Sequence, residues 1–322
     1  MAIAIPSGGG PQSPLSTSRP APALPVTGLE EPVAVNDETH CGAVIVAAGT
    51  SSRMAGQDKV AIDLAGKPVL AWSVDACERC SAISSVALVV RADQLDWARA
   101  LVAARGWSKV AAVREGGARR QDSVALGVAA LEGCEWIAIH DAARPFATAD
   151  LFTRCLESAL QHSGCSVAAT RINDTIKRVS GVTVAATLPR EELWAAQTPQ
   201  VCHRATLEQG LAQANAEGWT VTDEAMLFER LGQPVTVVES TDPNFKLTTP
   251  ADLTVARAIA GGPGGRGPGS RGAEEQRGKG DVAMGSVGGR VQSSAQPSVP
   301  DSPTTSRTSS PSSQFSPAPL LP

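Results

Sequence analysis

The chain has 322 residues, of which 42% are hydrophobic, and its formal net charge is -4 at pH 7. This length and this hydrophobic content suffice for one large or two ordinary domains, and they exclude a wholly disordered chain. The negative net charge argues against a general nucleic-acid surface, which needs a basic excess, so any phosphate binding must be local. No apolar run approaches the roughly 20 residues that a membrane span requires, and we expect no membrane partner.

The two ends of the sequence differ in composition from its centre. Residues 1–40 are rich in Pro, Ser, Ala and Gly, and we expect a disordered leader there. Residues 261–322 are of low complexity, and we expect a disordered tail. Seven cysteines, an odd number, and the absence of a secretory apolar segment favour a reducing compartment. We therefore predict the cytoplasm, with a plastid as the alternative because the leader contains Ser and Thr and few acids.

The central segment, residues 41–260, alternates strand-like and helix-like stretches. The apolar runs that predict buried strands are AVIVAA, SVALVV, KVAAV, WIAIH, SVAAT and PVTVVE. Helical patterns lie between most of them. This alternation predicts an α/β domain with a mostly parallel sheet flanked by helices, in which ligands bind beyond the carboxyl ends of the strands.

The first predicted strand ends in AAGTSSRM, residues 47–54. Consecutive backbone N–H groups at a turn of small residues form an anion cradle, and Arg53 adds a positive charge. Small residues also serve in tight turns, and the dinucleotide pattern G-x-G-x-x-G and the P-loop pattern are both absent. Lys59 follows in a polar loop, so Arg53 and Lys59 are candidates to close over a polyphosphate.

Two further motifs follow predicted strands. GGARRQDSV, residues 116–124, has glycines that permit close backbone approach, and Ser123 near a helix start suits a base or ribose contact. HDAARP places Asp141 and Arg144 at a strand end, where they either bind substrate or pair with each other in a turn. His140 is expected to pack or hydrogen-bond rather than to catalyse.

Three segments later in the chain complete the set. Residues 174–200 lack a useful helix before Glu191 and predict a projecting β-hairpin arm, which should pack on a second copy of the protein because it has little apolar area of its own. TDEAMLFERLG places Asp223 and Glu224 at a helix start, where N-capping is the simplest role. Lys246 follows the last predicted strand and is either a substrate ligand or a solvated charge.

In chain order, nine motifs closely resemble the 2-C-methyl-D-erythritol 4-phosphate cytidylyltransferase family of the non-mevalonate isoprenoid pathway. These motifs are AAGTSSRM, DK, LAGKPVLAW, GGARRQDSV, HDAARP, NDTIKRV, REELWAAQTPQ, TDEAMLFERLG and NFKLTTPADL. The resemblance covers almost all of residues 41–259. It implies a Rossmann-like nucleotidyltransferase sheet with a protruding arm, a homodimer, and transfer of CMP from CTP to the sugar-alcohol phosphate with Mg²⁺ and release of pyrophosphate.

The resemblance also implies roles for individual residues. Arg53 and Lys59 would stabilise the transition state on the triphosphate, whereas Arg190 and Lys246 would position methylerythritol phosphate, Arg190 in the partner's site. The residues implied on the cytidine side are Ala47, Ala48, Gly49, Gly117 and Ser123. Those implied beside the second substrate are Asp141, Arg144 and Thr175. Asp141 is also the candidate Mg²⁺ ligand, with the phosphates supplying most of the ligands.

The sequence departs from the family's pattern beside the triphosphate clamp. Ser51 stands where a second glycine is usual, and Asp58 stands where a proline is usual. The spacing between Arg53 and Lys59 is one residue short, and a carboxylate at position 58 is expected to weaken phosphate affinity. Two other functions stay open: a cytidylyltransferase for another polyol phosphate such as ribitol 5-phosphate, and a non-catalytic nucleotide-binding scaffold.

Overall fold

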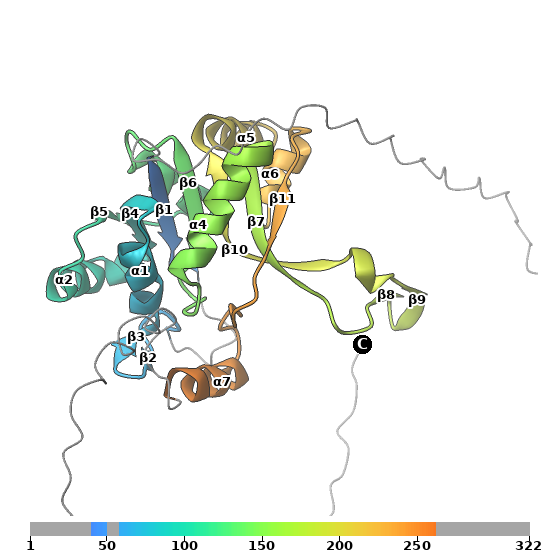
Figure 1. Ribbon diagram of the computed structural model, residues 1–322, viewed down its shortest axis with the longest axis horizontal. Helices are drawn as coiled ribbons and strands as arrows, with labels where there is room; N and C mark the ends of the chain where they lie inside the picture. The colour runs from blue at the N-terminus through green and yellow to red at the C-terminus, as the bar shows by residue number, and fades with distance from the viewer. Residues whose placement is uncertain (1–39, 50–57, 262–322) are drawn as a thin grey trace, which may run out of the picture. The chain divides into compact units, whose positions relative to one another are not determined.

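A seven-stranded sheet lies at the centre of the part of the chain that the computed structural model describes, residues 40–49 and 58–261 (Figure 1). Its strands are β1 (Cys41–Val46), β4 (Ile83–Val90), β5 (Val110–Glu115), β6 (Trp136–Asp141), β7 (Cys165–Arg171), β10 (Trp194–His203) and β11 (Thr236–Glu239). They lie in the order β11-β7-β10-β6-β1-β4-β5. All run in one direction except β10, which is antiparallel to β6 and β7. The predicted mostly parallel α/β sheet is thus confirmed.

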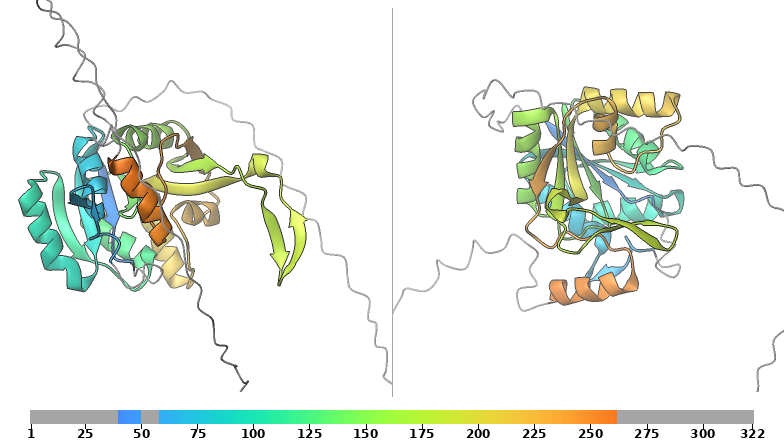
Figure 2. Two further views of the ribbon diagram at one scale, coloured as in Figure 1. Left: turned by 90° about the horizontal axis from the view of Figure 1, so that it is seen from below. Right: turned by 90° about the vertical axis from the view of Figure 1, so that its right-hand side faces the viewer.

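Helices cover both faces of this sheet (Figure 2). One layer contains α1 (Val69–Arg79), α2 (Leu95–Arg105) and α4 (Ala149–Ser158), and the other contains α3 (Arg120–Ala129), α5 (Arg204–Ala216) and α6 (Ala225–Arg230). Successive residues of β1 serve the two layers in turn: Ile45 packs in the first and Val44 in the second. Because both faces are covered, β1 is a continuous apolar run rather than an alternating one.

A third, smaller cluster lies beside the sheet and fixes the chain that follows β11. The closing helix α7 (Pro250–Gly261) packs with the short strands β2 (Asp63–Leu64) and β3 (Lys67–Pro68). Leu247 is fully buried in this cluster, and its N–H donates to the carbonyl of Ala143 at 2.8 Å. Residues on both sides of Leu247 are thereby held beside the end of β6.

The predicted arm is present as an antiparallel hairpin of β8 (Lys177–Ser180) and β9 (Thr183–Thr187), which extends away from the sheet in Figures 1 and 2. Its C-terminal limit differs from the prediction of residues 174–200. Residues from Trp194 onward belong to β10, where Trp194 pairs with Arg171. The physical reason is that β6 and β7 are not neighbours, so a strand must lie between them to satisfy their backbone groups.

Candidate active site

The cytidine-side residues of the sequence analysis meet where β1 and β5 end. A Cβ added to Gly116 would lie 2.3 Å from the Cβ of Ala48 and 2.8 Å from Oγ of Ser123. The Gly117 N–H donates to Oγ of Ser123 at 3.1 Å. The close approach of the two loops therefore requires glycine at 116, and Ser123 holds the loop that contains Gly117.

The residues directly after β1 differ in accessibility. Ala47 is buried, and its N–H donates to the carbonyl of Val89 at 2.7 Å. This bond to β4 fixes the backbone where the loop after β1 begins. Ala48 is half-buried. Gly49 is exposed, and no atom of the described residues lies within 4 Å of the position that a Cβ would take there. Arg53 lies outside the described residues, as does Ser51.

Lys59 lies in a turn in which the Ala61 N–H donates to the carbonyl of Asp58 at 3.1 Å. The neighbouring carboxylate of Asp58 is 2.8 Å from Nη2 of Arg91. The negative charge that was expected to weaken phosphate affinity therefore has a cation of its own.

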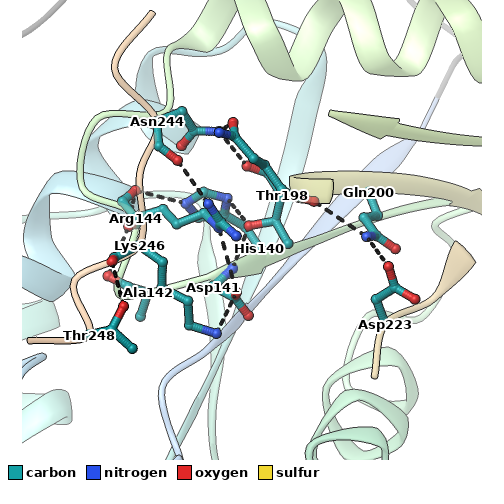
Figure 3. Close-up of polar contacts among 12 residues, drawn as sticks. His140, Asp141, Ala142, Arg144, Thr198, Gln200, Asp223, Asn244, Lys246 and Thr248 are labelled. Carbon is teal, nitrogen blue, oxygen red and sulfur yellow. Dashed lines mark hydrogen bonds and ion pairs between the residues drawn. The ribbon is translucent and has the colours of Figure 1, made fainter. Parts of the chain in front are cut away.

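Asp141, the last residue of β6, is surrounded by three cations, two of which, Arg144 and Lys246, are labelled in Figure 3. Nζ of Lys246 lies 2.8 Å from Oδ2, Nε of Arg144 lies 3.6 Å from Oδ2, and Nε of Arg120 lies 3.3 Å from Oδ1. Burial alone would raise the pKa of Asp141, but Arg120 and Lys246 hold it well below its usual range. Asp141 is thus a fixed negative charge. Together with its three cations it forms a cluster with a net positive charge at the end of the sheet.

The three cations have different access to solvent. The side chain of Lys246 is 37% exposed, whereas that of Arg144 is 11% exposed. Arg144 also donates to the carbonyl of Asn244 at 2.9 Å, and this bond ties it to the segment that contains Lys246. Lys246 is therefore the most accessible cation of the three for an anionic ligand. The sequence-predicted Asp141, Arg144 and Lys246 are brought together as one cluster.

The sequence analysis missed the pair formed by Arg120 and Glu224. Arg120 opens α3 and donates to both carboxylate oxygens of Glu224, at 2.6 and 3.0 Å. Burial raises the pKa of Glu224, and the Arg120 guanidinium opposes that rise. Glu224 is the N-cap residue of α6, as its place at the helix start predicted, but its side chain makes no capping hydrogen bond. Asp223, one residue earlier, accepts from the Met226 N–H at 3.2 Å.

A layer of polar residues behind Asp141 comes from β10 and the segment after β11. Oγ1 of Thr198 accepts the Asp141 N–H at 3.0 Å and lies 3.0 Å from Nδ1 of His140. Asn244 donates to the carbonyl of Thr198 at 2.8 Å (Figure 3). Burial lowers the pKa of His140 to about 4, so this imidazole is neutral at pH 7 and acts as a packing and hydrogen-bonding residue.

Arg190 and Thr175 flank the β8–β9 hairpin in the sequence, and this hairpin extends away from the sheet (Figure 1). Arg190 is half-exposed, and its Nη1 donates to the carbonyl of Asn173 at 2.6 Å. Thr175 is exposed in the loop that leads into β8. Within the described part of one chain, the structure does not bring these two side chains to Asp141.

The surroundings of Asp141 do not fit the role of a Mg²⁺ ligand. Both carboxylate oxygens already face cations, and a divalent ion there would be repelled by three positive side chains. Among the described residues, no group of three or more His, Cys, Asp or Glu side chains is placed to hold a metal ion.

In the same residues, no helix has the length and apolar character needed to cross a membrane.

A sheet of this topology binds ligands beyond the carboxyl ends of its strands, and here that edge has tight glycine turns and a cationic cluster, which suits an enzyme that acts on phosphate groups. A family model described as 2-C-methyl-D-erythritol 4-phosphate cytidylyltransferase matches residues 41–261. The chain belongs to this family, and the resemblance seen in the sequence motifs is confirmed.

Individual relatives agree with this family. A 2-C-methyl-D-erythritol 4-phosphate cytidylyltransferase of Prochlorococcus marinus (strain MIT 9313) is 46% identical over 219 residues, which cover 67% of this chain and 96% of the relative. The crystal structure of the enzyme of that name from Thermus thermophilus is 32% identical with a TM-score of 0.55, covering 68% of this chain and 98% of the other. A synthase structure from Anaerococcus prevotii DSM 20548 is 29% identical with a TM-score of 0.62, covering 69% and 96%.

Proposed function

We propose that the protein transfers CMP from CTP to 2-C-methyl-D-erythritol 4-phosphate, giving 4-diphosphocytidyl-2-C-methyl-D-erythritol and pyrophosphate in the synthesis of isoprenoid precursors. The observation that carries this proposal is the cluster of Lys246, Arg144 and Arg120 around Asp141, in a chain that belongs to this family. Such a cluster supplies fixed positive charge where a phosphate must be held.

The chemistry explains why cations are needed and a base is not. An oxygen of the acceptor phosphate, already ionised, attacks the α-phosphorus of CTP and forms the new P–O bond. The bond from the α-phosphorus to the bridging oxygen breaks, and its electron pair leaves with pyrophosphate. Two polyanions must approach each other for this step, so catalysis consists mainly of positioning and electrostatic stabilisation. No proton has to be removed from the nucleophile.

The residues divide into two groups around this reaction. Lys59, with Arg53, would hold the triphosphate and stabilise the charge that moves to pyrophosphate. Lys246 and Arg144 would hold the acceptor phosphate, and Asp141 fixes both by accepting from one and pairing with the other. Mg²⁺ would enter with CTP as a partner of the triphosphate, because that ion keeps waters and takes substrate phosphate oxygens as ligands.

We also propose a homodimer formed through the arm. Three valines of the hairpin are at least half-exposed: Val179 by 58%, Val182 by 102% and Val184 by 56%. Apolar side chains gathered on a hairpin without a core favour burial against another surface. In such a dimer, Arg190 and Thr175 would serve the site of the second copy, where they complete the contacts to methylerythritol phosphate.

The proposed location is the cytoplasm, with a plastid as the alternative. All seven cysteines are free thiols and buried, which fits a reducing compartment. Microscopy of the full chain fused at its C-terminus to a fluorescent protein separates the two, since a plastid signal would contradict the cytoplasmic assignment.

A comparison of acceptors tests the function. The purified full chain is mixed with CTP, Mg²⁺ and either methylerythritol phosphate or ribitol 5-phosphate, and pyrophosphate release is followed. We expect kcat/KM for methylerythritol phosphate to be higher by on the order of 10²-fold or more, since a site built to bind specific hydroxyls discriminates strongly. A higher kcat/KM for ribitol 5-phosphate would show that this compound, and not methylerythritol phosphate, is the acceptor. If neither acceptor gave pyrophosphate release, the hypothesis of a non-catalytic nucleotide-binding scaffold would be favoured.

A further inference from the structure

We infer that Asp58 is a positioning residue for Lys59, and that Arg91 and Gln94 anchor it. The inference rests on the proposed function in that Lys59 is taken to contact the triphosphate. The contacts that carry it are all among described residues at the end of β4 and in the turn before β2.

Both carboxylate oxygens of Asp58 are engaged. Oδ2 lies 2.8 Å from Nη2 of Arg91 and accepts a hydrogen bond from Nε2 of Gln94. Oδ1 accepts the Val60 N–H at 3.3 Å, so the side chain closes the turn on the far side of Lys59. The side chain of Asp58 therefore binds its own turn to another element of the fold.

Lys59 is fixed from its other neighbour as well. Val60 is 2% exposed within the core, and its carbonyl accepts the Leu70 N–H at 3.0 Å. One residue of the pair around Lys59 is thus held by the apolar core and the other by an ion pair. The backbone of Lys59 has little freedom to shift between them, which is the condition for a preorganised cation.

Gln94 and Arg91 hold Asp58 from a fixed part of the fold. Gln94 is only 6% exposed, and its Oε1 has no hydrogen-bond partner among the described residues. Burying an unpaired amide oxygen costs free energy. The hydrogen bond from Nε2 of Gln94 to Asp58 offsets part of this cost. Arg91 follows the last residue of β4 directly, so it is fixed to the central sheet.

The arrangement also explains how an acidic residue is tolerated beside the phosphate clamp. Arg91 neutralises Asp58 through a direct ion pair, and the carboxylate points to the end of β4. The negative charge at position 58 is thus balanced beside the residue that is proposed to contact the triphosphate.

A double-mutant cycle tests the inference on the full chain. We expect Asp58→Ala to lower kcat with CTP about 10- to 100-fold, because a displacement of about 1 Å at a catalytic group has effects of this size. In a Lys59→Ala background, the same substitution should cost less than about threefold, because a residue that acts through Lys59 has nothing left to position. Losses that multiply in the double variant would overturn the inference, as would an Asp58→Ala variant with unchanged kcat.

Matched variants separate positioning from folding. Arg91→Ala should lower kcat as Asp58→Ala does, and Arg91→Lys should restore most of it because the charge is kept. Asp93 is the control: it also pairs with Arg91, at 3.0 Å, but it is 68% exposed, and Asp93→Ala should leave kcat within about twofold. Equal losses from Asp58→Ala and Asp93→Ala would contradict the inference.

Calorimetric titration with CTP and Mg²⁺ gives a second readout that needs no acceptor. CTP affinity should fall in Asp58→Ala only when Lys59 is present. A wild-type protein that binds CTP but transfers nothing to either acceptor would refute the proposed function and leave this inference standing. A wild-type protein that transfers CMP normally, with a multiplicative cycle, would refute this inference alone.

Discussion

The cluster around Asp141 and the β8–β9 arm both contain residues assigned to methylerythritol phosphate, yet they are held in place very differently. In the cluster, Lys246 pairs at 2.8 Å with a carboxylate that is itself buried and contacted by two arginines. In the arm, Arg190 is half-exposed and donates to a backbone carbonyl of its own loop, and its pair with Glu191 is long, at 3.9 Å.

This difference shows which of the two regions is held in place within one chain. The cluster is preorganised: its charges are paired, its backbone is fixed by β6, and it needs no further partner to keep its geometry. The arm presents apolar and cationic side chains to solvent, and we propose that it gains its contacts against a second copy. The two regions should therefore respond differently to mutation, mixing, acid and dilution.

The largest expected effect is on transfer itself. Lys246→Ala and Arg190→Ala should each lower kcat/KM for methylerythritol phosphate by on the order of 10³, by analogy with removal of one preorganised donor. CTP affinity should change much less, because neither residue is assigned to the triphosphate. Steady-state kinetics with each substrate varied in turn measures both values, and a collapse of CTP affinity would reverse the assignment.

Mixing these two variants distinguishes a cluster residue from an arm residue. If the arm serves the second copy, a mixed dimer has one site with both defects and one intact site. Random mixing of equal amounts should then recover about a quarter of wild-type activity, since about half of the dimers are mixed. Activity that stays at the level of the single variants would place Arg190 in the site of its own chain.

The next effect concerns stability. Glu224 is 1% exposed and pairs with Arg120, so Glu224→Ala leaves a half-buried guanidinium partly unpaired and should lower the free energy of unfolding by about 3 kcal/mol. Glu191→Ala in the arm removes an exposed pair and should change it by less than about 0.5 kcal/mol. Urea unfolding of both variants checks this contrast, which a similar loss in both would contradict.

Most of the fold could be predicted from the sequence, because parallel strands that are buried on both faces appear there as continuous apolar runs. The sequence did not predict β10 as a strand of the sheet. This stretch mixes small and polar residues and contains Pro199, and a proline argues against a central strand when the sequence is read alone. The requirement for a strand between β6 and β7 appears only once the sheet order is known.

The same limit applies to the site. Asp141, Arg144 and Lys246 were predictable because charged residues at strand ends point to one edge of the sheet. The pair of Arg120 and Glu224 was not, since 104 residues separate them and each has a common local role, near a helix start or as a cap. Side chains that pair only through tertiary structure leave no local pattern in the sequence.

Acid should weaken the cluster before it affects the arm. Burial lowers the pKa of His140 to about 4, and the unperturbed value is about 6.5. Between these values the unfolded chain binds a proton that the folded chain excludes, so the free energy of unfolding should fall by about 3 kcal/mol as the pH falls from about 6.5 to 4. Above pH 6.5 His140 is neutral in both the folded and the unfolded chain, so this loss of stability is absent there. Urea unfolding at several pH values should show a smaller slope in His140→Gln, and the exposed His162→Gln is the matched control.

The smallest effect on folding, and the sharpest on association, is expected at the tip of the arm. Val182 is fully exposed in the turn of the hairpin, so Val182→Ser should change the free energy of unfolding of the chain by less than about 0.5 kcal/mol. If the arm packs on a second copy, the same change should raise the dimer dissociation constant about tenfold, because burying a valine side chain stabilises by about 1.5 kcal/mol. Sedimentation over a range of protein concentrations measures this constant.

Val237→Ser, at a 48% exposed valine on the edge strand β11, is the control that should leave association unchanged. A chain that sediments as a monomer at all concentrations, or an equal effect of both variants, would mean that the arm does not form the dimer contact.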